Sequence, residues 1–244
     1  MFVLVRQGSI YKLGEHKIAC GDCRDIQLVN ELIGDEKVSL VIADPPYGVG
    51  YIENKAGFVK VRVNKVIAND SFKNEEEYRK FASQWLSCLK PYLACKNSLY
   101  IFNSDKMLFA LKEAMDEQNI KLAQLLIWIK NQAVIGRRDF LAKHELIVYG
   151  WYGTHSFYKS KDSTVLYCPK PNVSSLHPTT KPLSLIRRLI LNSSKLGDVI
   201  FDPFAGSGTT LIACEQTRRR CLTIEIDPEY CKTVIERYKR LKGE

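Results

Sequence analysis

The sequence predicts an α/β protein with a mostly parallel sheet and helices on both faces. Two observations lead to this fold class. Val38–Ala43 is a short apolar run, rich in β-branched residues and stopped by two prolines, as expected of a strand buried on both faces. The last third of the chain alternates strand, helix, strand and helix, an order that builds parallel sheets. A length of 244 residues suits one such domain with elaborations, over 1–244.

The periodicity of the apolar residues predicts the elements in order. Short edge strands joined by glycine-containing turns are expected within 1–20, where apolar and polar residues alternate loosely. Helices are expected where apolar residues repeat every three to four positions, and strands where β-branched and aromatic residues run together. The expected helices are 26–33, 74–89, 106–119, 183–192, 211–216 and 229–242. The further strands are 38–43, 98–102, 122–129, 144–149, 198–201 and 220–224.

Two basic segments lack a clear period. The segment 48–73 is predicted to be a mobile loop that contacts phosphates or closes over a substrate, because long irregular loops in compact domains are usually functional. A second segment, 151–176, interleaves aromatic residues with lysines, which fits a nucleic-acid surface and equally fits a hairpin with exposed lysines. The candidate nucleic-acid contacts are Lys55, Lys60, Arg62, Lys65, Arg137, Arg138, Lys159 and Lys161.

The composition narrows the class of partner. A formal charge of +9 favours an acidic partner, with nucleic acid ahead of a membrane surface, although a merely soluble basic protein would show the same charge. No apolar run is long enough to span a bilayer and no signal peptide is evident, so a cytoplasmic protein is expected. Cys20 and Cys23 have the spacing of a metal-binding pair, but the sequence has no second pair of cysteines at such a spacing. Reduced thiols and no metal site are therefore expected.

Asp44-Pro45-Pro46-Tyr47 follows the first buried strand directly. Open α/β sheets hold ligands at the carboxyl ends of their strands, where Asp44 is expected to lie. The two prolines stiffen the turn and remove two backbone donors, so its carbonyls are available as acceptors. An acceptor carboxylate, an acceptor carbonyl and the ring of Tyr47 together suit a planar group that bears an NH2, such as the amino edge of a nucleobase. A strand that simply ends in a proline turn is the alternative.

A glycine-rich turn follows the later strand that ends at Asp202. Gly206-Ser207-Gly208 lies between this strand and a helix, and such a turn lets a ligand approach the backbone. A phosphate-binding P-loop is rejected because no Gly-Lys-Ser/Thr follows, and a dinucleotide fingerprint is weakened because Leu211 stands where the third glycine belongs. The third alternative is an adenosyl pocket, in which Glu225, at the end of the next strand, would hold a ribose diol.

Three motifs in this order resemble the β class of amino-group DNA methyltransferases. They are Asp44-Pro45-Pro46-Tyr47, then His177-Pro178-Thr179-Thr180-Lys181-Pro182, then Phe201 to Thr210, and the resemblance runs from about residue 8 to residue 242. It implies the Rossmann-like S-adenosylmethionine-dependent methyltransferase fold, with a seven-stranded sheet. It also implies S-adenosylmethionine as cofactor and double-stranded DNA as partner, with a mobile loop at 48–73 and a small target-recognition insertion at 136–176.

The resemblance assigns roles to particular residues. Asp44, Pro45, Pro46 and Tyr47 would be catalytic. The cofactor-binding residues would be Asp22, Cys23, Asp44, Thr179, Lys181, Asp202, Phe204, Ala205, Gly206, Ser207, Gly208, Thr209, Thr210, Glu225 and Ile226. Within this set, Lys181 and Thr179 would approach the methionine end, and Asp22 and Cys23 the adenine. The basic candidates given above would contact DNA.

The target that the resemblance implies is the exocyclic amine of adenine in duplex DNA. An Asp at the head of the motif goes mostly with adenine in this class and a Ser with cytosine, so N6-methyladenine is predicted and cytosine-N4 is the alternative. The target base would be flipped out of the duplex to reach the site. A non-catalytic nucleic-acid-binding module is a third alternative, disfavoured by the intact acids. The sequence leaves open whether the chain dimerises and whether it serves a restriction-modification system with a cognate endonuclease.

Overall fold

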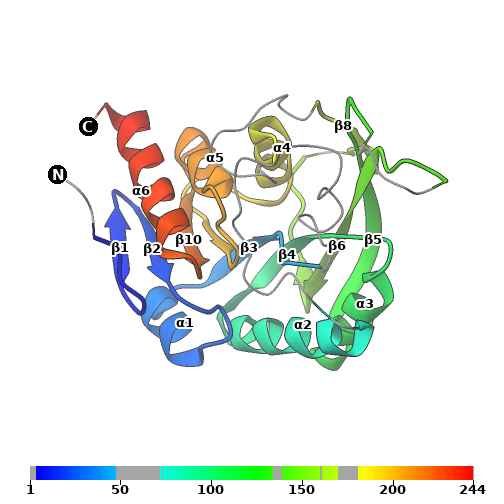
Figure 1. The fold of residues 1–244 in the computed structure, drawn as a ribbon, viewed down its shortest axis with the longest axis horizontal. Coiled ribbons are helices and arrows are strands. Elements are labelled where there is room, and N and C mark those ends of the chain that lie inside the picture. Colours follow the sequence, from blue (N-terminus) through cyan, green and yellow to red (C-terminus); the bar gives the residue numbers. More distant parts are fainter. Residues whose placement is uncertain are drawn as a thin grey trace.

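The computed structural model describes residues 4–47, 72, 74–133, 139–159, 161–169 and 181–243. Its strands lie in the order β1-β2-β10-β9-β3-β4-β6-β5-β8, and β7 pairs with β4 outside this path (Figure 1). The strands are β1 (Ile10–Leu13), β2 (His16–Cys20), β3 (Val38–Ala43), β4 (Leu93–Asn103), β5 (Ile120–Ile129), β6 (His144–Tyr152), β7 (Thr154–His155), β8 (Val165–Tyr167), β9 (Val199–Asp202) and β10 (Arg220–Glu225). The helices are α1 (Ile26–Ile33), α2 (Glu75–Leu89), the 3-10 turn η1 (Lys90–Tyr92), α3 (Leu108–Glu117), α4 (Leu183–Ser193), α5 (Thr209–Thr217) and α6 (Pro228–Lys242).

The sheet is parallel at its centre, as predicted. Strands β2, β10, β9, β3 and β4 all run in one direction, whereas β6 is antiparallel to both β4 and β5. The expected number of seven strands is wrong, because the described residues form ten. A run of seven from β2 to β5 makes up the body of the sheet, and β1, β7 and β8 add to it. β1 and β8 pair with the strands at the two edges of this body, β2 and β5, whereas β7 pairs with the first half of β4.

Two hydrophobic cores lie on opposite faces of this sheet. Side chains alternate between the faces of a strand, so Val41 and Ala43 of β3 pack in the core under α1, α2 and α3. Leu40 and Ile42 pack in the second core, under α4, α5 and α6. Figure 1 shows these two layers of helices, one on each side of the sheet. Because both faces are covered, the carboxyl edge of the central strands is where a ligand can reach the sheet.

The helix ends follow the expected local chemistry. Asn74 caps α2 by accepting from the backbone N–H of Glu77, and three acidic residues occupy the first turn of that helix. Asp22 precedes α1 but does not cap it. Asp25 caps that helix by accepting from the N–H of Gln27 at 2.9 Å. Asp22 instead accepts from the backbone and the guanidinium of Arg24, and its carboxylate stays near the end of β2.

Several predicted features fall outside the described residues. Of the loop expected at 48–73, the structure describes Phe72 alone, and the segment 136–176 is described in part. Its described portion contributes β7 and β8, where sequence periodicity gave no strand. Among the described residues no helix is long and apolar enough to cross a membrane. The eight cysteines are free thiols, and Cys95 is the one exposed to solvent.

Candidate functional site

The carboxyl ends of β3 and β9 lie side by side at the centre of the sheet. The two strands are parallel neighbours, and Val41 pairs with Phe201. Parallel strands lie about 4.8 Å apart, so Asp44, three residues beyond Val41, lies close to the turn that begins at Asp202. The charge of Asp44 accordingly contributes to a raised pKa of Asp202. The strand tips that sequence analysis singled out therefore form one site.

Lys181 reaches this site from the amino end of α4, in the helix layer that also contains α5 and α6. Its Nζ lies 2.7 Å from Oδ2 of Asp44 and 3.2 Å from Oε2 of Glu145. It also faces the ring of Phe102, at 4.9 Å from the centroid. The ammonium is buried, and burial alone would lower its pKa, but Asp44 and Glu145 raise the pKa above its usual value. Lys181 is therefore a fixed cation that touches the predicted catalytic carboxylate directly.

A second buried pair extends this arrangement. Nζ of Lys130, just after β5, lies 2.6 Å from Oε1 of Glu145, near the start of β6. Burial would raise the pKa of Glu145, but Lys181 and Lys130 outweigh it and lower that pKa to about 2. We call Asp44, Lys181, Glu145 and Lys130 the buried charge chain. Sequence analysis missed Glu145 and Lys130, because their contacts form only when β5 pairs with β6 and Glu145 meets Lys181 in the folded protein.

The glycine-rich turn after β9 is held by hydrogen bonds to its backbone. Oδ1 of Asp202 accepts from the N–H of Phe204 at 2.9 Å, and Oε2 of Glu225 accepts from the N–H of Gly206 at 2.7 Å. Gly208 has a φ of +78°, and a Cβ placed there would lie 2.8 Å from Cγ1 of Val234 in α6. Glycine is thus required at position 208 for both its dihedral angles and its close approach to α6.

Arg237 supports the same turn from α6. Its Nη1 donates to the carbonyl oxygen of Ser207 at 2.9 Å and approaches Oγ1 of Thr209 at 3.3 Å. Burial lowers the pKa of this guanidinium. Sequence analysis missed Arg237, since one basic residue in an amphipathic terminal helix carries no local signal.

Two buried acids near the turn hold protons more readily than usual. Burial raises the pKa of Asp202 to about 7, although hydrogen bonds from Thr210 and from the backbone of Phe204 oppose the shift. Burial also raises the pKa of Glu225 to about 7, against hydrogen bonds from the N–H groups of Asp227 and Gly206. Acids whose pKa is strongly shifted by burial are typical of functional sites.

Aromatic side chains of α2 line one side of the turn. Phe204 lies against Phe81 and Trp85, with ring centroids 6.0 and 5.6 Å apart. Tyr78 and Trp85 are buried, yet no described residue is a hydrogen-bond partner of the Tyr78 hydroxyl or of Nε1 of Trp85. Because buried polar groups are nearly always hydrogen-bonded, these two donors are suited to a ligand. Tyr47 is half-buried against the same core, and burial raises the pKa of its hydroxyl.

The segment Gly21-Asp22-Cys23 reaches the same edge. Glu225 pairs with Cys20, and the N–H of Gly21 donates to the carbonyl oxygen of Glu225 at 2.9 Å. Asp22 is ion-paired with Arg24 at 2.6 Å, and Arg24 lies over the ring of Phe81. Cys23 is buried, and burial raises the pKa of its thiol. Asp22 therefore lies just beyond the carboxyl end of β2, with its charge paired to Arg24.

The structure gathers the predicted acidic residues but does not describe every candidate. Asp22, Asp44, Lys181, Asp202 and Glu225 lie at one edge of the sheet. The candidates outside the described residues are Thr179, Lys55, Lys60, Arg62, Lys65, Arg137 and Arg138. The remaining predicted positions are described and lie in these same turns: Pro45, Pro46, Ala205, Thr210 and Ile226.

Lys159 and Lys161 lie apart from the carboxyl edge. Tyr158 donates its N–H to the carbonyl oxygen of Asn192, and Asp162 pairs with Arg188, so both lysines flank the carboxyl half of α4. Lys181 precedes the amino end of that helix, which at 11 residues is about 16 Å long. Their contact with DNA stays a prediction.

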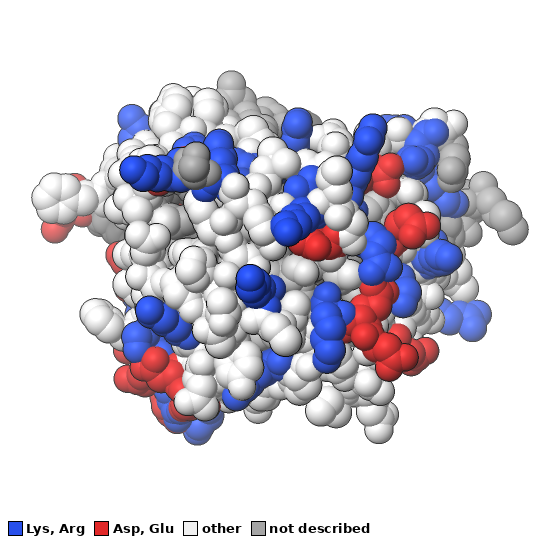
Figure 2. Space-filling view, turned by 180° about the vertical axis from the view of Figure 1, so that it is seen from behind, with Lys and Arg blue, Asp and Glu red and all other residues white. Residues whose placement is uncertain are grey.

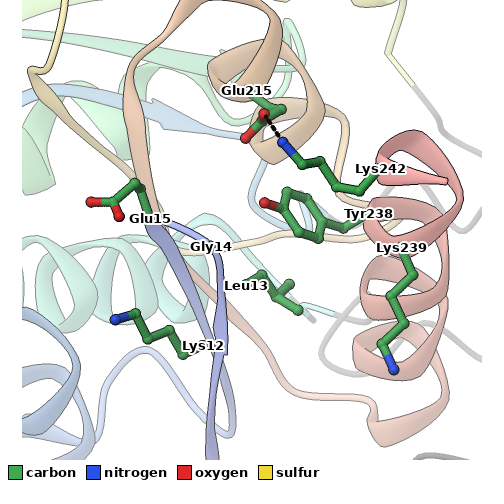
Figure 3. A pocket seen from close by; sticks show the side chains of 8 residues that line it. All are labelled: Lys12, Leu13, Gly14, Glu15, Glu215, Tyr238, Lys239 and Lys242. Atoms are coloured by element: carbon green, nitrogen blue, oxygen red, sulfur yellow. Dashed lines mark hydrogen bonds and ion pairs between the residues drawn. The ribbon is translucent and has the colours of Figure 1, made fainter. Parts of the chain in front are cut away.

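A separate cavity lies at the opposite end of β2. It measures about 340 Å³ and is lined by the β1–β2 turn, by α6 and by Glu215 of α5. Figure 3 shows Tyr238, Lys239 and Lys242 reaching into it from α6, with Lys242 hydrogen-bonded to Glu215. The turn precedes His16, whereas the site described above follows Cys20 at the other end of β2. This cavity is therefore not part of the site.

The fold and the paired strand tips define an S-adenosylmethionine-dependent methyltransferase fold. The complex of M1.HpyAVI with SAM matches with a TM-score of 0.66 at 23% identity, over 90% of this chain and 98% of that one. The PvuII DNA methyltransferase, described as cytosine-N4-specific, matches with a TM-score of 0.69 at 17% identity, over 96% of this chain and 95% of that one. At these identities the likeness shows the fold alone.

The family follows from the sequence comparisons. Residues 38–236 match the family described as DNA methylase, the N6 and N4 methyltransferases. The Type II methyltransferase M2.DpnII of Streptococcus pneumoniae is 30% identical, over 86% of this chain and 84% of the relative. M2.MboI of Moraxella bovis, also a Type II methyltransferase, is 27% identical over 85% and 82%. The chain belongs to the DNA methylase family.

Proposed function

We propose that this chain transfers a methyl group from S-adenosylmethionine to N6 of a specific adenine in double-stranded DNA. The observation that carries the proposal is the contact of Asp44 with Lys181, one strand away from the glycine-rich turn of Asp202. An acceptor carboxylate for an amine and a nucleoside pocket thus share one edge of the sheet. The net charge of +9 supports a polyanionic substrate. On the face shown in Figure 2, Lys and Arg are widely spread, whereas Asp and Glu gather mainly toward its sides.

The residues present fit the cofactor. Each oxygen of Glu225 accepts one backbone N–H and keeps a second lone pair for a ribose hydroxyl. Phe204 and the α2 aromatic side chains would face the adenine, and the raised pKa values of Asp202 and Glu225 suit a pocket that receives a cationic ligand. When bound, S-adenosylmethionine supplies a methyl group on a positively charged sulfur. We propose the same cofactor-binding residues as the sequence predicts, with Arg237 and Tyr78 added.

Asp44 would activate the target amine by accepting a hydrogen bond from it. The lone pair of an exocyclic amine is delocalised into the ring, so the amine is a poor nucleophile. Asp44 and the carbonyl of Pro45 would accept hydrogen bonds from its two N–H groups. These hydrogen bonds would favour a pyramidal nitrogen and stabilise the developing positive charge. The proton leaves after the nitrogen has become cationic, so no strong base has to act beforehand. Tyr47 would stack on the flipped base.

Adenine is favoured over cytosine by Asp44 at the head of the catalytic motif. The likeness to the cytosine-N4-specific enzyme extends to the fold alone and carries no weight for the target. The relatives are named as Type II methyltransferases. We further propose that methylation by this chain protects its recognition site from a cognate endonuclease. We propose that it acts in the cytoplasm, with its basic loops contacting DNA.

A labelled-methyl assay tests the proposal. The protein is incubated with mixed-sequence duplex DNA and S-adenosylmethionine tritiated on its methyl group, and the DNA is digested to nucleosides and separated. Label in N6-methyldeoxyadenosine is expected, and the Asp44→Ala protein serves as the control. Label in N4-methylcytosine would establish the alternative target, and no label on any duplex or single strand would overturn the proposed activity.

A further inference from the structure

The buried charge chain contains two residues to which the proposed reaction assigns no role. Glu145 and Lys130 lie on the β5–β6 hairpin, and their side chains are 17% and 7% exposed. Among the described residues, Glu145 is linked to Asp44 by its ion pair with Lys181, and Lys130 is linked to Lys181 by its ion pair with Glu145. Four alternating charges in a row therefore end on Asp44, and the two remote ones require an explanation.

Stability alone does not explain them. Burying charges costs free energy, and replacing buried ion pairs by apolar residues of similar size is often neutral or stabilising. The contact of Lys181 with its two carboxylates is also unequal. It donates to Asp44 at 2.7 Å, whereas its ion pair with Oε2 of Glu145 is longer, at 3.2 Å, and no other described residue donates to that oxygen. Lys181 is thus attracted in two directions and bound more closely to Asp44.

The geometry points to Glu145 as a positioning residue. We propose that Glu145, itself held by Lys130, shares the charge of Lys181 and so prevents Lys181 from neutralising Asp44 fully. Asp44 then remains a strong acceptor for the target amine while Lys181 fixes its orientation. This inference rests on the proposed function for the identity of the amine, but the charge sharing itself is a property of the ligand-free protein.

Substitutions at Glu145 and Lys130 should act in opposite directions. In Glu145→Gln, Asp44 is the one carboxylate left to Lys181, so the pair tightens and Asp44 becomes a weaker acceptor. In Lys130→Met, Glu145 has Lys181 as its one remaining cation, draws it away from Asp44, and Asp44 becomes more basic. Among the described residues, the other titratable groups whose pKa Asp44 influences are Tyr47, Tyr78 and Asp202, and both variants leave them in place.

The readouts are kcat, KM for the cofactor, and the acidic limb of the pH profile of kcat. For Glu145→Gln we expect kcat to fall by on the order of 10- to 100-fold, KM to change less than about threefold, and the acidic limb to move to lower pH. For Lys130→Met we expect that limb to move to higher pH. Glu36→Gln is the matched control. Glu36 pairs with Arg220, and it precedes β3 at the end opposite Asp44. Its profile should coincide with that of the native protein.

The double variant separates positioning from charge balance. Glu145→Gln alone leaves Lys130 as a buried, unpaired cation, and adding Lys130→Met removes it. We expect the double variant to recover thermal stability while kcat and the acidic limb stay as in Glu145→Gln. Recovery of all three would overturn the proposal, and so would a Glu145→Gln profile identical to that of the native protein.

Titration of the Asp44 carboxyl carbon by NMR tests the inference without any substrate. Aspartate labelled with carbon-13 is assigned by comparison with Asp44→Asn, and its pKa is expected to be lower in Glu145→Gln than in the native protein. An unchanged pKa would contradict the inference even if methyl transfer is found. A protein without methyl transfer, but with this pKa change, would contradict the proposed function and leave the charge sharing established.

Discussion

Nζ of Lys181 lies 2.7 Å from Oδ2 of Asp44, although the two residues are 137 positions apart in the chain. Asp44 ends a central strand that is covered by helices on both faces, and Lys181 immediately precedes the helix α4. Each of the two charged groups would be costly to bury alone, and each makes the burial of the other tolerable. Their contact fixes the position of the carboxylate before any substrate arrives.

Replacing Asp44 by Ala is expected to remove methyl transfer and leave cofactor binding nearly unchanged. The variant loses the acceptor for the amine, a loss of more than about 100-fold in kcat, whereas the glycine-rich turn and Glu225 keep their contacts. Lys181 retains Glu145 as a partner, so the fold should persist. Calorimetric titration with S-adenosylmethionine gives the affinity, and the tritium assay gives the turnover. Measurable turnover in this variant would show that Asp44 does not have the assigned role.

Replacing Asp202 by Asn is expected to stabilise the ligand-free protein in a pH-dependent way. Burial raises the pKa of Asp202 to about 7 in the folded state, so the folded protein holds a proton that the unfolded chain has released. The native protein, which carries Asp202, therefore loses free energy of unfolding as the pH rises from about 4 through 7. Asn should gain roughly 2–3 kcal/mol more at pH 8 than at pH 5.

Urea unfolding at the two pH values measures this difference. Asn can still accept the N–H of Phe204, so the turn is expected to keep its geometry. Asp35→Asn, at an exposed position, is the control and should show no comparable difference. Equal gains at pH 5 and pH 8 would mean that Asp202 is ionised throughout this range.

Replacing Gly208 by Ala is expected to destabilise the protein by more than its backbone angle alone requires. A positive φ costs a non-glycine residue about 1–2 kcal/mol, and overlap with Val234 adds roughly 1–3 kcal/mol. Gly197 is the matched control, because its φ of +79° is nearly the same and nothing lies within 4 Å of an added Cβ. Thermal unfolding of the two variants isolates the contact with Val234.

The double variant Gly208→Ala with Val234→Ala should bring the loss closer to that of Gly197→Ala. If Gly208→Ala and Gly197→Ala lower the unfolding temperature equally, Val234 of α6 does not approach position 208 as closely as the structure describes.

Replacing Arg237 by Met is expected to weaken cofactor binding roughly tenfold, the effect of losing one hydrogen bond from a charged donor. The variant frees the carbonyl of Ser207 from α6, so the turn must be ordered when the cofactor binds. The exposed Arg240, one turn further along the same helix, provides the control variant Arg240→Met. Equal dissociation constants for the two variants would exclude a supporting role for Arg237.

Local patterns predicted most of the elements and the acidic residues of the site. The strand before Asp44 and the turn after Asp202 carry their own signals, because prolines and glycines end apolar runs abruptly in both. Short strands such as β7 and β8 could not be predicted, since two or three residues show no period, and each forms by pairing with a longer strand, β4 or β5. Glu145, Lys130 and Arg237 could not be predicted either, because their roles depend on contacts across the fold.

The paired tips of β3 and β9 have a consequence for a chain that is still being synthesised. The ribosome synthesises Asp44-Pro45-Pro46-Tyr47 early, but β9 and its glycine-rich turn lie in the last quarter of the chain. A nascent or truncated product that ends before Val199 carries the acceptor for the amine and lacks the pocket beside it. Such fragments are expected to be inert toward DNA, so modification begins only once translation has delivered the carboxyl-terminal strands.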